Sequence, residues 1–295
     1  MLLVCGANGN LGGAVVAALR RSVGPAGFIA GTRDPQSPFA RSLAHSGVQV
    51  RRVDYDDPAS LPEAFAGIEA VLIISTYADN SRRLQQHLNV IEAAKAVGVR
   101  RLVYTSFLDA GPDALSEHSR LVHYPTEQAL IRSGLDYTIL RHALYADLFI
   151  GDLSLTLETG VLHRASGTAA CAYIARDDLG VSAAAVLANK GHENRIYTET
   201  MLQPLTGDEV AQTLGEVFGR EIRYEAVAAE DWPVFMERHL GVPLVLARSA
   251  IGTMRAIESG AFDVATTDYE RIAGRKPRTL EEFLLAHRQA AAGAV

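Results

Sequence analysis

Three glycines, Gly6, Gly9 and Gly12, lie between a short apolar run and an amphipathic segment in "CGANGNLGGAVVAAL". In the spacing G-x-x-G-x-x-G, the first two permit a tight turn and close approach of the backbone to a pyrophosphate, and the third lets a helix pack closely on a strand. The N-terminus of the following helix would offer free N–H groups to the same anion. Because the motif follows a predicted strand and opens a predicted helix, it predicts a dinucleotide-binding turn, with a ligand-free glycine turn as the alternative.

The end of the second apolar run, "GTRDP", bears on which nicotinamide dinucleotide would bind. An acidic residue at this strand end binds the ribose 2′-hydroxyl of NAD, whereas an arginine accommodates the 2′-phosphate of NADP. Arg33 stands at the strand end, and Asp34 is one step later, where we expect its side chain to point elsewhere. A guanidinium suits bidentate phosphate recognition, so Arg33 favours NADPH over NADH. The alternative is a solvated loop arginine.

Polar residues follow three further predicted strands. Asp54 is placed to accept a hydrogen bond from the adenine amino group, Ser75 and Thr76 to lie near the ribose and pyrophosphate, and Thr105 and Ser106 near the nicotinamide. Each residue alone is typical of a turn or cap. Together they favour a binding edge, because ligands of open α/β sheets bind at the carboxyl ends of the strands.

The elements that would position these residues alternate along the first half of the chain, which is typical of right-handed βαβ units and a parallel sheet. The clearest helix is "SRRLQQHLNVIEAAKAVG", with Ser81 as its expected N-cap and Gly98 at its end. Residues 1–142 are therefore predicted to form a Rossmann-type, doubly wound α/β domain. The expected strands are Leu2–Cys5, Gly27–Arg33, Val48–Asp54, Ala70–Ser75, Arg101–Ser106 and Asp136–Arg141.

After Arg141 the regular alternation stops. We expect residues 143–295 to form a smaller, mainly helical domain over the carboxyl edge of the sheet, with Arg195–Glu199 as a strand able to return to the main sheet. Thr206 and Glu209 have the spacing of a capping box at the start of one of its helices.

Composition excludes several classes of protein. The chain of 295 residues is 48% hydrophobic and 21% charged, with a formal net charge of −6 and a pI of about 5.9. That balance argues against nucleic acid or an anionic membrane as a partner. Two lone cysteines, Cys5 and Cys171, give neither a disulfide framework nor a metal site. With no visible secretory signal and no apolar run as long as a membrane span, we expect a cytoplasmic protein.

Five segments spread over residues 2–200 share a continuous register with a known family: "GANGNLG", "DYDDPASL", "QQHLNVIEAAKAVGVRRLVYTS", "TEQALIRSGLDYTILRHALY" and "GHENRIYT". In them the chain resembles the NmrA-like branch of the atypical short-chain dehydrogenases, and within it the type-two NAD(P)H:quinone oxidoreductases and the triphenylmethane reductases. The resemblance implies a monomer or dimer that binds NADPH along a Rossmann domain, with a small C-terminal domain closing an open substrate cleft. The family's cofactor contacts correspond here to Gly6, Asn8, Asn10, Leu11, Arg33, Asp54, Ser75, Thr76 and Thr105.

The segment "HYPTEQAL" departs from other short-chain dehydrogenases, in which a tyrosine acts as general acid and a lysine four residues later lowers its pKa from about 10. Here Tyr124 is followed at that spacing by Gln128. Quinone reductases that this chain resembles keep the lysine but need not have the tyrosine, and triphenylmethane reductases lack the lysine. Gln128 can hydrogen-bond to a ribose hydroxyl but brings no charge, so Tyr124 would be a poor acid. Pro125 also disfavours a helical Tyr124, whose alternative role is that of an aromatic at the helix entry.

The segment "RHALYADLF" is expected at the mouth of the cleft. Related proteins commonly have asparagine where His142 stands, and a histidine would put a group that titrates near neutral pH beside the substrate. The alternative is a buried histidine bonded to the backbone. Tyr145 and Phe107 are the aromatics expected around a flat acceptor, with core packing as the alternative. The other histidines considered have no metal-ligand spacing: His87, His118, His163, His192 and His239.

Three functional hypotheses follow from these residues. The first is an NADPH-dependent reductase that passes hydride directly to a flat, conjugated, electron-poor acceptor such as a quinone or a cationic triphenylmethane compound, where orientation supplies most of the catalysis. The second is a non-catalytic NADP(H) sensor that binds a partner protein. The third is a carbonyl dehydrogenase or epimerase that uses Tyr124 as its acid.

Overall fold

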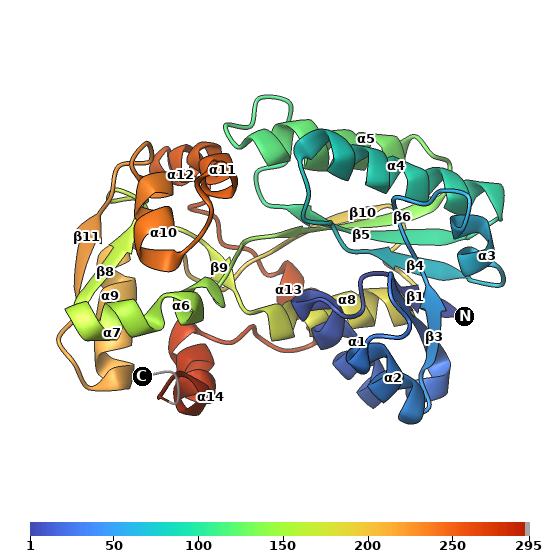
Figure 1. Ribbon diagram of the computed structural model, residues 1–295, viewed down its shortest axis with the longest axis horizontal. Helices are drawn as coiled ribbons and strands as arrows, with labels where there is room; N and C mark the ends of the chain where they lie inside the picture. Colours follow the sequence, from blue (N-terminus) through green and yellow to red (C-terminus); the bar gives the residue numbers. More distant parts are fainter. Residues whose placement is uncertain (293–295) are drawn as a thin grey trace.

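A seven-stranded, all-parallel sheet forms the centre of the molecule, with the strand order β10-β6-β5-β4-β1-β2-β3 (Figure 1). The structure is a computed structural model that describes residues 1–292. β1 and β4 lie in the middle of the sheet and are buried on both faces, as expected for parallel strands covered by helices. The strands are β1 (Leu2–Val4), β2 (Phe28–Thr32), β3 (Gln49–Arg52), β4 (Ala70–Ile73), β5 (Arg101–Phe107), β6 (Asp136–His142) and β10 (Arg195–Glu199).

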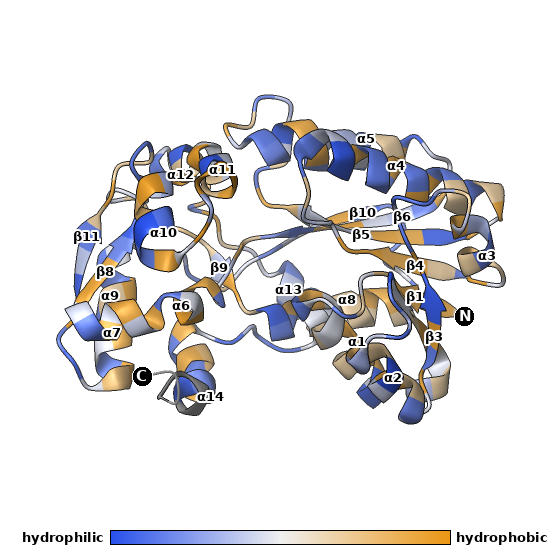
Figure 2. Ribbon diagram, viewed as in Figure 1, coloured by the Kyte–Doolittle hydropathy of each residue, from blue (hydrophilic) through white to orange (hydrophobic). Residues whose placement is uncertain are grey.

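Helices cover both faces of this sheet and bury two separate apolar layers. One layer packs under α3 (Leu61–Phe65), α4 (Asn80–Ala96) and α5 (Tyr124–Ile131). The other lies against α1 (Asn10–Ser22), α2 (Pro38–His45) and α8 (Arg176–Ala188). Figure 2 shows the central strands β4 and β5 largely hydrophobic and the outer helix α4 largely hydrophilic. The predicted Rossmann-type doubly wound sheet is therefore confirmed.

Each expected strand is present, and its ends lie within two residues of the predicted ones. Arg195–Glu199 does return to the main sheet, where β10 pairs in parallel with β6 and places Glu199 beside His142. The N-cap prediction for α4 is wrong: Asp79 caps the helix by accepting from the Arg82 N–H at 2.9 Å. A carboxylate two residues earlier outcompetes the Ser81 hydroxyl, which donates to that same carboxylate at 2.6 Å.

The remaining elements form a second, smaller group with its own apolar core, which lies beyond the carboxyl ends of the sheet strands (Figure 1). The predicted capping box of Thr206 and Glu209 opens α9. Because α8 and β10 pack on the main sheet although they follow residue 142, the division of the chain at that residue stays a prediction. The elements of this group are β7 (Leu144–Tyr145), α6 (Leu148–Gly151), α7 (Leu153–Thr159), β8 (Val161–Arg164), β9 (Tyr173–Ile174), α9 (Gly207–Phe218), β11 (Arg223–Ala226), α10 (Trp232–Leu240), α11 (Leu244–Ala247), α12 (Ile251–Glu258) and α14 (Leu280–Ala292). α13 (Asp268–Ala273) packs instead on α8 and β10.

No helix within residues 1–292 is long and apolar enough to cross a membrane.

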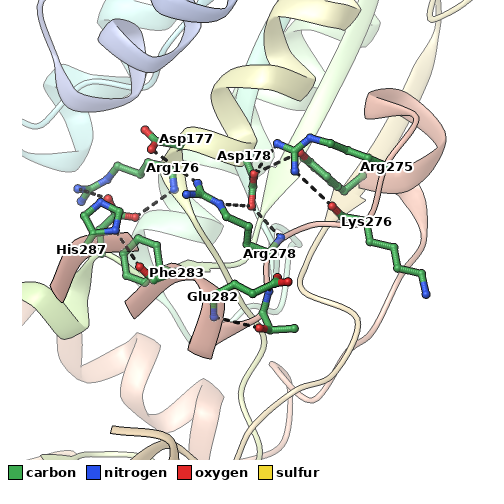
Figure 3. A network of polar contacts seen from close by, with 12 residues as sticks. Arg176, Asp177, Asp178, Arg275, Lys276, Arg278, Glu282, Phe283 and His287 are labelled. Carbon is green, nitrogen blue, oxygen red and sulfur yellow. Dashed lines mark hydrogen bonds and ion pairs between the residues drawn. The ribbon is translucent and has the colours of Figure 1, made fainter. Parts of the chain in front are cut away.

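One buried carboxylate fastens the C-terminal segment to α8 (Figure 3). Asp178, in the first turn of α8, accepts from the guanidinium of Arg275 at 2.8 Å and from Arg278 through both its backbone N–H, at 2.9 Å, and its side-chain Nε, at 3.2 Å. The Tyr269 hydroxyl lies 3.4 Å from the same carboxylate. Since a buried charge is costly unless its lone pairs are satisfied, these donors select one docking geometry for the chain after α13.

We predict that Asp178→Asn lowers the free energy of unfolding by about 2–3 kcal/mol, because it removes the negative charge shared by two arginines and one of the two acceptor oxygens without changing the side-chain volume. Urea denaturation followed by circular dichroism measures the loss. Asp177→Asn is the matched control, since Asp177 is 66% exposed and lies 3.6 Å from Arg278; it should cost less than about 0.5 kcal/mol. Equal losses in the two variants would contradict the proposed anchoring.

Candidate functional site

The glycine turn after β1 is shaped to receive an anion. Gly6 has φ +68°, a left-handed conformation that favours glycine, and its carbonyl accepts from the Gly9 N–H at 3.0 Å. A Cβ on Gly12 would lie 2.1 Å from the Gly6 carbonyl oxygen, so only glycine allows this approach of α1 to the turn. The exposed N-terminus of α1 has no side-chain cap and no acidic residue in its first turn. Free N–H groups beside a turn with no competing carboxylate fit a pyrophosphate.

The side chains expected around the rest of that turn are divided between solvent and core. Asn8 and Asn10 are exposed at the turn, whereas Leu11 packs in the apolar cluster that contains Ala143 and Ile174. Any contact of Leu11 with a ligand would therefore be through its backbone.

Arg33 follows β2 as an exposed side chain that makes no hydrogen bond or ion pair with any residue in the described part of the chain. Asp34 is engaged in its own turn, where its carboxylate accepts from the Gln36 N–H at 2.8 Å. Asp54 pairs with Arg52 at 3.1 Å and accepts from a backbone N–H of its own loop. At this end of the sheet the guanidinium of Arg33 is thus available for a phosphate, and the neighbouring carboxylates are partly occupied.

Hydroxyl groups at the ends of β4 and β5 bond mainly to the protein itself. Thr105 Oγ1 accepts from the backbone N–H of Ser75 at 3.0 Å, and the Ser106 hydroxyl donates to Glu127 at 2.6 Å. The Thr76 hydroxyl is hydrogen-bonded to Gln86. These contacts tie the strand ends to α4 and α5. Direct contact of these hydroxyls with a cofactor stays a prediction.

Helix α5 is fixed on the sheet by a buried ion pair that the sequence analysis did not identify. Glu127, 1% exposed, receives two hydrogen bonds from Arg141 of β6, from Nε at 2.9 Å and from Nη2 at 2.6 Å. A bidentate guanidinium–carboxylate pair sets distance and orientation together. It therefore determines where the neighbouring residues of α5 lie.

Tyr124 and Gln128 lie one turn apart on α5, and both are partly exposed. Neither side chain makes a hydrogen bond to another described residue, so both are free to meet a ligand. The expectation that Pro125 keeps Tyr124 out of the helix is wrong, since Tyr124 has φ −60° and ψ −50°. It follows a π-helical turn, Ser119–His123, that leads directly into α5, and Pro125 stands in the first turn of α5, where its missing N–H is tolerated.

The residues predicted to surround the acceptor differ in exposure. Phe107, at the end of β5, is partly exposed, and so is Tyr145 of β7, whose ring lies under the Arg176 guanidinium at 4.8 Å. His142 is fully buried, so its ring does not reach a substrate in this conformation. Its Nδ1 lies 3.5 Å from the Tyr145 hydroxyl and its Nε2 lies 3.4 Å from a Glu199 carboxylate oxygen, which replaces the expected backbone partner.

A cluster of three buried or partly buried histidines lies behind this edge, and nothing in their sequence spacing predicted it. His123 Nδ1 lies 2.9 Å from the Tyr104 hydroxyl, and His87 Nδ1 lies 3.0 Å from Thr126. His118 packs against Phe107 with ring centroids 5.0 Å apart. Burial, followed by the charge of Arg83, lowers the pKa of His118 to about 4 and that of His87 to about 3. The same causes hold the pKa of His123 well below its usual range.

This sheet, its glycine turn and its polar strand ends define the class of Rossmann proteins with a dinucleotide-type phosphate turn. Residues 1–284 match the NmrA-like family, and the chain belongs to that family. The family resemblance drawn from the sequence is confirmed.

Proteins of this family with assigned activities are similar over nearly their whole length. Quinone oxidoreductase 2 of Escherichia coli (strain K12) is 33% identical over 288 residues, which cover 96% of both chains. The structure of the NADPH-dependent quinone oxidoreductase from Escherichia coli complexed with NADPH superposes with a TM-score of 0.90 at 31% identity, covering 98% of this chain and 100% of that one. Citrobacter sp. triphenylmethane reductase complexed with NADP(H) gives 0.88 at 34% identity, covering 96% and 98%.

The neutral histidines should make stability depend on pH. Between the ordinary histidine pKa of about 6.5 and the lowered native value of about 4, His118 binds a proton only in the unfolded chain, so stability falls as pH falls through that window. We predict that His118→Gln makes this fall shallower by up to about 1.4 kcal/mol per pH unit. Urea denaturation between about pH 7 and about pH 5 measures the slope, with His239→Gln, the replacement of an exposed histidine, as the control. An unchanged slope in the His118 variant would refute the assignment.

Proposed function

We propose that the protein is an NADPH-dependent oxidoreductase that transfers hydride directly to a flat, conjugated, electron-poor acceptor such as a quinone or a triphenylmethane-type compound. The observation that carries the proposal is the pairing of an uncapped glycine turn after β1 with an unengaged guanidinium, Arg33, after β2. Both lie at the carboxyl edge of one sheet. Relatives named for quinone and triphenylmethane reduction, which share the fold over nearly the whole chain, support the same activity.

Under this proposal the residues along the carboxyl edge hold the two halves of the dinucleotide. The turn Gly6–Gly12 and the N-terminus of α1 bind the pyrophosphate, and Arg33 binds the 2′-phosphate. Gln128 offers its amide to the nicotinamide ribose, while Ser75 and Thr105 set the path of the chain beside it. Bound NADPH would supply the hydride, and NADH, which lacks the 2′-phosphate, would be the weaker donor.

Acid catalysis by the protein is not required for such acceptors. Tyr124 has Gln128 rather than a cation one helical turn later, so the pair that assists proton donation is incomplete. A quinone delocalises the incoming electrons and takes its proton from water, which leaves orientation against the nicotinamide as the main contribution of the site. Phe107 and Tyr145 would position the flat acceptor, with His142 orienting the Tyr145 hydroxyl from behind.

Other properties of the protein stay proposals with the function. The partner of the site is a small aromatic molecule rather than nucleic acid, in keeping with a net charge of −6. We expect a monomer or homodimer that works in the cytoplasm, with both cysteines as free, buried thiols.

The function is tested by mixing purified protein with NADPH and a series of quinones and triphenylmethane dyes and following the absorbance of NADPH. We predict acceptor-dependent oxidation, and we predict that Tyr124→Phe lowers kcat by less than about threefold, because general-acid catalysis would otherwise contribute about 10²-fold or more. Loss of activity in this variant would favour a tyrosine-dependent carbonyl reductase. Tight NADPH binding without turnover of any acceptor would favour a sensor.

Arg33 sets the cofactor preference in this proposal. Arg33→Ala should raise the dissociation constant for NADPH by about 10–100-fold, since a charge-assisted phosphate contact contributes about 1.5–3 kcal/mol, and should leave that for NADH nearly unchanged. Titration followed by nucleotide fluorescence measures both constants. The control is Arg41→Ala, an exposed arginine on α2. Equal weakening of the two nucleotides would show that Arg33 does not read the 2′-phosphate.

A further inference from the structure

Arg83 on α4 is a partly buried guanidinium with no carboxylate partner. Within residues 1–292 it takes part in no ion pair, and its buried Nε has no hydrogen-bond acceptor. Its Nη2 donates to the Ser75 hydroxyl at 2.9 Å and lies 3.4 Å from His123 Nε2. Its neighbour Arg82, by contrast, points outward and forms a bidentate pair with Asp56. A desolvated cation without a counter-charge is costly, so its position calls for an anion.

The groups around Arg83 do not supply that anion. The nearest ring is His123, and both burial and the charge of Arg83 lower the pKa of that imidazole, which is therefore neutral. With His123 Nε2 turned toward a cation, its other nitrogen carries the proton and donates to the Tyr104 hydroxyl. Burial raises the pKa of Tyr104 well above its ordinary value, so its hydroxyl is neutral as well.

The location of Arg83 identifies which anion it could meet. Its guanidinium contacts Ser75, at the end of β4, and His123, immediately before Tyr124 on α5. His123 stacks on Phe107 at 5.9 Å, and Phe107 packs at 5.5 Å on Phe262 of the second group of elements. The cation therefore lies between Ser75, a predicted contact of the ribose and pyrophosphate, and an aromatic residue predicted to face the acceptor. The backbone N–H of Ser75 bonds in turn to Thr105, a predicted nicotinamide contact. The pyrophosphate is served by the glycine turn after β1.

We propose that Arg83 is an electrostatic catalytic residue that stabilises the negative charge which develops on an acceptor oxygen as hydride arrives. This inference rests on the proposed function and specifies its substrates as neutral, oxygen-bearing acceptors, above all quinones. The C–H bond of the donor breaks, and the hydrogen leaves with both electrons to the quinone, while NADPH becomes NADP⁺. The quinone becomes a hydroquinone monoanion, which then takes one proton from water. Arg83 acts on the oxygen of that monoanion.

A cationic acceptor gives the opposite expectation. When a triphenylmethane cation receives hydride at its central carbon, the product is neutral, and no negative charge develops on any atom. Arg83 then has nothing to stabilise, and its own charge disfavours the binding of the cation. Comparing the two classes of acceptor therefore distinguishes two possible roles of Arg83. A role in catalysis affects only the quinone reaction, whereas a role in binding NADPH affects both reactions equally.

The test compares Arg83→Gln with wild-type protein, using 1,4-naphthoquinone and malachite green as acceptors. We expect kcat for the quinone to fall about 10²-fold, as for loss of one oxyanion donor, and the rate for the dye to stay the same or rise. Arg83→Lys, which keeps a positive charge, should recover the quinone rate to within about tenfold of wild type. Lys95→Gln removes a charge from the far end of the same helix and should change neither rate.

A binding measurement keeps the inference testable apart from turnover. 2-Hydroxy-1,4-naphthoquinone is a flat enolate at neutral pH, and its dissociation constant, measured by isothermal titration calorimetry, should rise about tenfold or more in Arg83→Gln while that of NADPH does not change. Equal losses with both acceptors together with weaker NADPH binding would assign Arg83 to the cofactor and overturn the proposal. An unaltered quinone rate and an unaltered enolate affinity would overturn it too. Failure of the wild-type protein to turn over either acceptor would contradict the proposed function instead, and the enolate affinity would still decide whether Arg83 binds an anion.

Discussion

The buried carboxylate of Glu127 is the contact on which the geometry of the site depends. At 1% exposure it must be fully paired, and it is paired by Arg141 from β6 and Ser106 from β5. A single charge thus joins two neighbouring strand ends to α5. This pairing fixes the position of α5, and with it the positions of Tyr124 and Gln128 at the carboxyl edge. It also fixes the end of the preceding π-helical turn, where His123 contacts Tyr104.

The buried charged groups around the sheet differ in how completely they are hydrogen-bonded. Asp178, which docks the C-terminal segment on α8, receives hydrogen bonds from two arginines and is complete (Figure 3). At the carboxyl ends of β6 and β10, both oxygens of the fully buried Glu199 lack a hydrogen bond, and His142 lies 3.4 Å away. Arg83 is likewise incomplete near the ends of β4 and β5. Arg101 at the amino end of β5 and His163 in β8 also have an unpaired nitrogen, so incomplete pairing alone does not mark a ligand site. At the carboxyl edge it coincides with the predicted cofactor and acceptor contacts.

Features encoded by local spacing were predictable from the sequence. The glycine turn, the parallel strands and the return of Arg195–Glu199 each follow from a short pattern that reads the same in any fold of this class. The role proposed for Arg83 was not predictable, because it depends on a contact with His123, which lies forty residues further along the chain. The proline rule failed at Tyr124 because a π-helical turn, which propensity does not predict, begins at Ser119 and leads directly into α5, so that Tyr124 continues a helix already under way.

The position of the positive charge in the site determines which reductions it favours. In a tyrosine–lysine pair the cation makes the tyrosine a better acid, so the reduced carbonyl receives its proton from the protein. Here Gln128 leaves that position neutral, and the cation, Arg83, bonds to Ser75 at the end of β4. A site arranged in this way stabilises an oxyanion without protonating it. Quinones suit such a site, because a hydroquinone monoanion is a weak base that can be protonated by water after hydride transfer is complete. Aliphatic ketones do not, because an alkoxide is a strong base that needs its proton during hydride transfer.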